Sequence, residues 1–283
     1  MHNETFQKLS EDGLISESEF ITIQQFEKSK PVSLYWDLKT LLYTGIILLT
    51  SGVGILIYKY IDTIGHDVMI TIIGLCWIIC FLYCIKKAKP YSNLKTSSPN
   101  FWFDYILLLG CLLLLTLIGY IQFQYNVFGN RWGLATFIPM VLLFISAYYF
   151  DHLGVLSLAI TNLAAWAGIT ATPLGLIKEN DFGNAQIIYS GIVLGAGLIA
   201  FAFLSNRKNI KAHFEFTYKN FGTHILLISC LAGLFYFDTI ILWFMLIAAA
   251  GAGLFRHSLH TRSFYFLVVT LLYFYIALSY VVI

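Results

Sequence analysis

Charge is scarce in this sequence: Asp, Glu, Lys and Arg make up 11% of its 283 residues, less than half of the share of about 25% found in soluble domains. Apolar and aromatic residues account for 59%. A soluble core could not cover so much apolar surface without exposing large patches, whereas lipid solvates it directly. The composition therefore excludes an ordinary soluble domain and predicts an all-α polytopic membrane protein.

Motifs of common enzymes are also absent. The sequence contains no G-x-S-x-G, H-E-x-x-H, C-x-x-C or Walker pattern, which argues against the commonest hydrolase, redox and nucleotide chemistries. All five cysteines fall inside apolar runs, where neither a disulfide nor a zinc site is expected. The lysines lie in separate short loops without the interleaved aromatics of a nucleic-acid site. We expect no catalytic residues, no cofactor, no metal and no nucleic-acid partner, and no motif indicates a small-molecule substrate.

The first 38 residues form an acidic head with three lysines and seven carboxylates, a net charge of −4. This head is too polar and too long for the charged start of a secretory signal, so no cleavable signal is expected. Ser16 and Glu19 have the spacing of a capping box, in which each side chain accepts a backbone hydrogen bond from the other residue. Residues 1–38 are predicted to be a cytoplasmic helical hairpin, and residues 1–30 could bind a protein partner.

Residues 39–283 are predicted to be a transmembrane helical bundle, because apolar runs of about 20 residues, the length that crosses a bilayer, follow one another along the chain. Nine such runs are expected to span the membrane. They are Thr40–Tyr58, Val68–Ile85, Phe101–Phe123, Gly133–Phe150, Leu153–Thr170, Ala185–Leu204, Phe221–Phe237, Thr239–Phe255 and Phe264–Ile283.

Two of the expected turns, at Asp151 and at Asp238, interrupt long apolar stretches. Cytoplasmic loops carry an excess of Lys and Arg, and nine spans divide the seventeen basic residues fourteen to three in favour of the N-terminal side. Joining the fourth and fifth runs into one span would change this division to nine to eight. Phe221–Phe255 would be about 52 Å long as one helix, too long for a single span. We therefore predict both turns, a cytoplasmic N terminus and a C terminus outside.

The head and first span resemble a known family. The segment L-S-E-D-G-L-I-S-E-S-E-F from Leu9 to Phe20 is followed by Y-T-G-I-I-L-L-T-S-G-V-G-I-L-I from Tyr43 to Ile57. This pairing of a short G-L-I head with a glycine-rich first span is similar to the bacterial membrane family called domain of unknown function 2157. The resemblance covers about the first 60 residues. It implies a multi-pass protein of the bacterial cytoplasmic (inner) membrane and assigns no catalytic residue.

Four ionisable residues are predicted to lie at one depth, near the cytoplasmic face. Asp104 and His224 each lie about one turn into a span, and Asp151 and His152 form the turn between the fourth and fifth spans. Such groups often line ion or proton paths, so a carboxylate and imidazole cluster is one interpretation. The favoured alternative is structural: Asp104 stabilises a helix N-terminus, Asp151 caps the fifth span, and His224 lies within reach of water.

Near mid-membrane, Thr161 and Asn162 are the most central polar residues, and either could contact a substrate. Packing is the favoured interpretation, because Asn and Thr commonly form hydrogen bonds between membrane helices. Small residues four apart, Gly191 with Gly195 and Ala249 with Gly253, are expected to let helices approach closely.

Two functional hypotheses follow from these patterns. The first is a non-enzymatic membrane component, an anchor, sensor or complex subunit, whose head binds a protein and whose bundle contacts membrane lipid. The second is a transporter or channel for a small solute, ion or lipid. A membrane-embedded enzyme that uses Asp151, His152 and His224 is a third and less favoured alternative.

Overall fold

The computed structural model describes residues 16, 19, 21, 35–171, 185–261 and 263–282. It divides into two compact units, residues 1–49 and residues 50–283. Most of the acidic head lies outside the described residues, and with it most of the predicted hairpin and of residues 1–30, which are predicted to bind a partner. The capping box is nevertheless described and confirmed: the Ser16 N–H donates to the Glu19 carboxylate at 2.9 Å, and the Glu19 N–H donates to the Ser16 hydroxyl at 3.3 Å.

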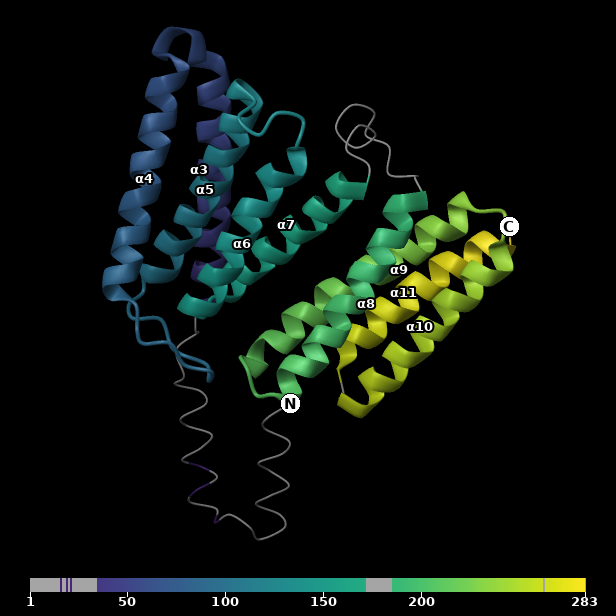
Figure 1. The fold of residues 1–283 in the computed structure, drawn as a ribbon. Coiled ribbons are helices and arrows are strands. Elements are labelled where there is room, and N and C mark those ends of the chain that lie inside the picture. The colour runs from purple at the N-terminus through teal and green to yellow at the C-terminus, as the bar shows by residue number, and fades with distance from the viewer. Residues whose placement is uncertain are drawn as a thin grey trace. The chain divides into compact units, whose positions relative to one another are not determined.

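The regular elements among the described residues of the body are all helices, with no strand, so the all-α prediction is confirmed for them (Figure 1). In the part of the chain that the structure describes, nine α-helices coincide in order with the nine apolar runs. They are α3 (Tyr35–Ile64), α4 (His66–Lys87), α5 (Phe103–Tyr125), α6 (Trp132–Phe150), α7 (Leu153–Ala171), α8 (Ala185–Arg207), α9 (Glu215–Tyr236), α10 (Ile240–Thr261) and α11 (Phe264–Val282), with a short 3-10 helix η2 (Ala212–Phe214) before α9.

Among the described helices, six are long and apolar enough to cross a membrane by length and composition: α4, α5, α6, α7, α8 and α11. The described part of the chain therefore has several candidate spans, while a total of nine and the sides of the two termini stay predictions. Both predicted turns are present. Helix α6 ends at Phe150 and α7 begins at Leu153, and α9 ends at Tyr236, four residues before α10 begins at Ile240.

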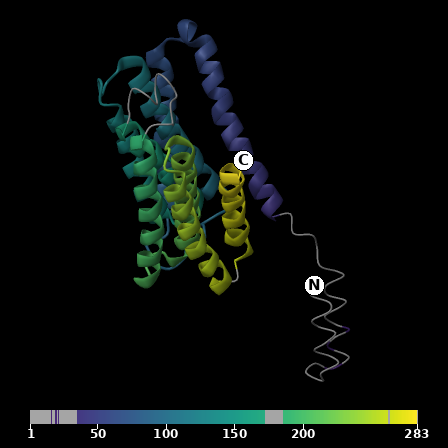
Figure 2. The same ribbon diagram turned by 90° about the vertical axis from the view of Figure 1, so that its right-hand side faces the viewer.

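Within residues 50–283, consecutive helices pack against one another in pairs, most extensively α8 with α9, α6 with α7 and α4 with α5. Two apolar cores result. The first joins helices from α4 to α9 and includes Phe103, Leu143 and Leu156. The second joins α8 to α11 around Trp243 and Leu234. Figure 2 shows α8 to α11 from the side, as neighbouring helices that run up and down.

Glycine explains the close contact of α8 with α9. A Cβ added at Gly195 would lie 2.6 Å from the backbone nitrogen of Leu226 and 2.9 Å from the carbonyl of Gly222, so only glycine fits there. The expected packing role of Gly191 and Gly195 is confirmed. The same expectation is wrong for Gly253, because a Cβ added there would meet nothing within 4 Å; α10 lines an open cavity at this position.

Candidate functional site

The turn between α6 and α7 places the carboxylate of Asp151 between the end of one helix and the start of the next. Asp151 has φ 59° and ψ 45°, the left-handed conformation that often ends a helix, and its N–H donates to the carbonyl of Ala147. Asp tolerates this conformation better than most residues that carry a Cβ. The expectation that Asp151 caps the following helix is wrong. His152 does so instead, because its ring Nδ1 accepts the N–H of Val155 at 3.0 Å.

The Asp151 carboxylate is the centre of a buried group of polar side chains, here called the Asp151 cluster: Thr96, Asp151, Lys211 and His213. Oδ2 accepts the Thr96 N–H at 2.5 Å and the Thr96 hydroxyl at 2.7 Å. Oδ1 lies 2.5 Å from Nε2 of His213 and 3.2 Å from Nζ of Lys211. The Asp151 side chain is 1% exposed. Three hydrogen-bond donors and one ammonium therefore surround one buried carboxylate.

Two opposing effects act on the pKa of this carboxyl. Burial raises the pKa of Asp151, whereas the hydrogen bonds from the Thr96 backbone and hydroxyl, from His213 and from Lys211 lower it, and together they outweigh burial. The net pKa lies below the ordinary value, so Asp151 is an anion at neutral pH. The buried Lys211 ammonium provides the opposite charge, which makes the pair a neutral unit in an apolar setting.

Lys211 lies in the segment between α8 and α9 and also contacts the segment between α4 and α5. Its backbone is also left-handed, with φ 49°, and its N–H donates to the carbonyl of Asn93 at 3.1 Å. Its Nζ lies 5.2 Å from the centre of the Tyr91 ring. The segment between α4 and α5, the α6–α7 turn and the segment between α8 and α9 therefore meet at Asp151. This arrangement can hold three connections together, and it leaves no oxygen of the carboxylate without a donor.

A second carboxylate lies beside the cluster. Asp104, in the first turn of α5, accepts the Ser98 hydroxyl at 2.5 Å. Its Oδ1 is 4.0 Å from Nε2 of His152, too far for a direct hydrogen bond. The structure thus brings three of the four predicted residues, Asp104, Asp151 and His152, to the same end of the helices, and Asp104 stands at the helix N-terminus as the structural interpretation expected.

His224 does not follow the predicted grouping. Its Nδ1 lies 2.9 Å from the hydroxyl of Tyr273 and its Nε2 lies 3.0 Å from the hydroxyl of Tyr265. The Tyr265 hydroxyl in turn donates to Asn220 at 2.6 Å. The histidine lies on the side of α9 that faces α11. Its hydrogen bonds join these two helices.

The two mid-membrane candidates lie on α7. The Thr161 hydroxyl donates to the carbonyl of Ser157 in its own helix, at 2.9 Å, so the expected hydrogen bond to another helix is wrong for Thr161. The amide nitrogen of Asn162 is buried, and no described residue accepts a hydrogen bond from it. In the part of the chain that the structure describes, no group of three or more His, Cys, Asp or Glu residues could hold a metal ion.

The sequence did not single out Thr96, Lys211 or His213. A signal was present, because the tally of basic residues placed the Asp151 turn and the segment with Lys211 and His213 on one side of the membrane. A carboxylate in a turn between apolar helices needs a partner, and a short loop on the same side that carries Lys-x-His is the nearest source of one.

Comparison with known families agrees with the fold. The model of the family described as "Predicted membrane protein (DUF2157)" matches residues 7–156, more than half of the chain. The chain belongs to this family. Its match extends from the head through α6 and includes both Asp104 and Asp151. No curated protein and no solved structure matches the chain. The family description and the apolar helices together identify a membrane protein with several candidate spans.

Proposed function

We propose that this DUF2157 protein is a non-enzymatic component of the bacterial cytoplasmic (inner) membrane, an anchor, sensor or complex subunit that docks a protein partner through its acidic head. The observation that carries the proposal is the state of its polar side chains. Asp151 forms hydrogen bonds with Thr96 and His213 and an ion pair with Lys211, and His224 is held between two tyrosines. Groups engaged in this way stabilise helices and loops, and chemistry or ion passage would require exchangeable partners.

The Asp151 cluster also supports a docking role for the face on which it lies. Three connections between helices are tied to one buried ion pair, which gives this end of the bundle a fixed shape. A fixed surface loses little conformational entropy when a partner binds. The tally of basic residues assigns this face, together with the head, to the cytoplasm. The proposed topology has nine spans, with the N terminus inside and the C terminus outside.

Charge favours the head as the docking element. Residues 1–38 carry a net charge of −4, while the rest of the chain carries +6. The Ser16–Glu19 capping box stabilises the start of a helix within this acidic segment. An acidic segment at the membrane surface fits a partner with a basic surface, because complementary charge increases the rate of association and the specificity of binding.

The proposal is tested by cross-linking in native membranes. The full-length chain is compared with a variant that lacks residues 1–30 and with a variant in which Glu11, Asp12 and Glu17 are replaced by their amides. We expect at least one cross-linked protein to be lost about tenfold in both variants while the membrane level of the chain is unchanged. An unchanged set of cross-linked proteins contradicts the docking role.

Two substitutions examine the transport alternative in the same cells. Asp104→Asn and Asn162→Leu change the two polar groups that a permeation path through the bundle would use. We expect growth and solute uptake to equal those of the wild type at equal protein level. A defect in uptake with normal insertion would replace the proposed role by transport.

A further inference from the structure

A cavity between three helices on the side of α9 away from His224 has no role in the proposal above. Its volume is about 310 Å³, and it is bounded by α8, α9 and α10, with Phe266 of α11. Lys219, Thr223 and Leu226 of α9 form its floor, and Ile199 and Phe203 of α8 form one wall. The opposite wall is the α10 segment around Ala249, Gly253 and Leu254. Ligand cavities in proteins begin at about this size.

The cavity opens onto the outer surface of the helices. Phe203 is 43% exposed, and both Ala249 and Gly253 at the opposite wall are exposed. Gly253 has no atom within 4 Å of the position of an added Cβ, so the space beside it is empty. Helix α8 is a candidate span, and the outer surface of a span contacts lipid. A lipid molecule can therefore enter this cavity sideways, between α8 and α10.

Inside the cavity, Thr223 presents a hydroxyl that the protein leaves without a partner. Thr223 is 1% exposed, and no described residue forms a hydrogen bond with its Oγ1. Threonine in a helix commonly donates to a carbonyl of the preceding turn, as Thr161 and Thr270 do in this chain. A buried hydroxyl without a partner costs free energy. An oxygen of a bound ligand would remove this cost.

Lys219, one turn before Thr223, brings an ammonium to this end of the cavity. Its ammonium forms an ion pair with Glu215 and lies 4.3 Å from the centre of the Phe203 ring. Exposed Arg207 and Arg256 lie one turn beyond the cavity on α8 and α10. Basic groups at this depth attract anionic headgroups.

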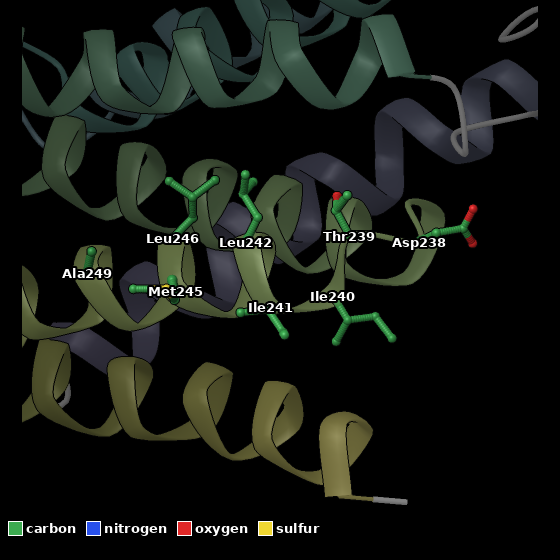
Figure 3. A pocket seen from close by; sticks show the side chains of 8 residues that line it. All are labelled: Asp238, Thr239, Ile240, Ile241, Leu242, Met245, Leu246 and Ala249. Carbon is green, nitrogen blue, oxygen red and sulfur yellow. The ribbon is translucent and has the colours of Figure 1, made fainter.

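The cavity continues into an apolar groove along α10. Ala249 lines both the cavity and the open groove of about 1000 Å³ that runs toward Asp238. Figure 3 shows Leu242, Leu246 and Ala249 on the same side of α10. With Gly253 they form a stripe about 16 Å long, at 1.5 Å per residue. Leu242 is 55% exposed and Leu246 is 44% exposed, so this stripe offers apolar contact to a chain that lies along it.

We propose that this site binds one anionic membrane lipid, with its phosphate oxygens at Thr223 and Lys219 and an acyl chain along the α10 stripe. A phosphate with an attached acyl chain satisfies both parts of the site, since free phosphate cannot use the apolar groove and an uncharged chain cannot use the ammonium. The inference does not depend on the docking role of the head, because none of its residues belongs to that segment.

The test uses the full-length protein in detergent and native mass spectrometry. The probes are phosphatidylglycerol, phosphatidylcholine with the same acyl chains, and inorganic phosphate. Gly253→Leu places a side chain in the cavity, where an added Cβ would meet no atom within 4 Å, and Thr223→Val replaces the hydroxyl by a methyl group. Gly197→Leu is the matched control, because Gly197 is also exposed and free of neighbours but does not line the cavity. Thermal unfolding of each variant verifies that it folds.

We expect the wild type and Gly197→Leu to retain one phosphatidylglycerol in preference to phosphatidylcholine. Gly253→Leu should lose it, and Thr223→Val should weaken it about fivefold to tenfold, the effect of one hydrogen bond. Equal retention of both lipids, equal loss in the two leucine variants, or equally tight binding of phosphate alone overturns the proposal. Cysteines at Leu242 and Leu246 that cross-link two copies and exclude lipid would instead identify the stripe as a dimer interface.

Discussion

Removing the carboxylate of Asp151 should destabilise the helical bundle strongly. In Asp151→Ala, the fully buried Lys211 ammonium loses its counter-ion, and the Thr96 N–H and hydroxyl lose their acceptor. Breaking a buried ion pair by removing one partner costs about 3–5 kcal/mol. Because both side chains are 1% exposed, solvent screening does not reduce this cost. The loss is a large fraction of the ~5–15 kcal/mol that stabilises a typical domain.

The assay is equilibrium unfolding in mixed micelles, followed by tryptophan fluorescence. Asp238→Asn is the control, because Asp238 is an exposed carboxylate in the other predicted turn, and surface changes usually shift stability by less than about 0.5 kcal/mol. Asp151→Asn should lie between the control and Asp151→Ala, since the amide oxygen still accepts from Thr96. Replacing Lys211 by Met in the Asp151→Asn background should restore part of the lost stability by removing the uncompensated charge.

Two results would refute this reasoning. If Asp151→Ala unfolds at the same point as Asp238→Asn, the buried cluster contributes nothing to stability. If Asp151→Ala is destabilised but Lys211→Met does not restore stability to the Asp151→Asn variant, the cost comes from the Thr96 hydrogen bonds and the turn geometry, and the ion pair is not the cause.

Three further predictions follow. Because the folded pKa of Asp151 lies below its unfolded value, its contribution is present above about pH 4 and is lost as the pH falls through the folded pKa; acid unfolding curves should be steeper for the wild type than for Asp151→Asn. Gly195→Ala should lower stability by about 1–3 kcal/mol through overpacking against α9, with Gly197→Ala unchanged as its control in the same unfolding assay. In a variant without native cysteines, an impermeant maleimide should label Asn130→Cys from outside and Lys95→Cys only after the membrane is opened; the reverse pattern would invert the proposed topology.

The helices could be predicted from the sequence because their signals are local. Each apolar run has its own length and its own polar ends, and these decide where a helix starts and stops. The α6–α7 turn was harder, because only Asp151 and His152 interrupt the apolar residues there. It was predicted from a non-local rule, the distribution of basic residues among loops. The structure has the break at that position.

The direction of a side chain around its helix could not be predicted from the sequence. Thr223 and His224 are consecutive on α9, yet Thr223 lines the cavity between α8 and α10 whereas His224 meets the tyrosines of α11. One residue along a helix corresponds to a rotation of about 100°, so neighbours at one depth contact different helices. The grouping of His224 with Asp104 therefore depended on the packing of α9, which no periodicity in such uniformly apolar helices reveals.

The burial of two lysines bears on the predicted topology. Lys211 and Lys219 were counted among the fourteen basic residues of the N-terminal side, but both are buried and paired, with Asp151 and Glu215. Without these two lysines, the remaining basic residues divide twelve to three in favour of the N-terminal side, so the rule still predicts a cytoplasmic N terminus. The remaining excess includes residues that stay exposed, among them Lys86, Lys87 and Arg207. Exposed charges near helix ends are the ones that resist transfer across a membrane, so the prediction of a cytoplasmic N terminus depends on the loops after α4 and α8.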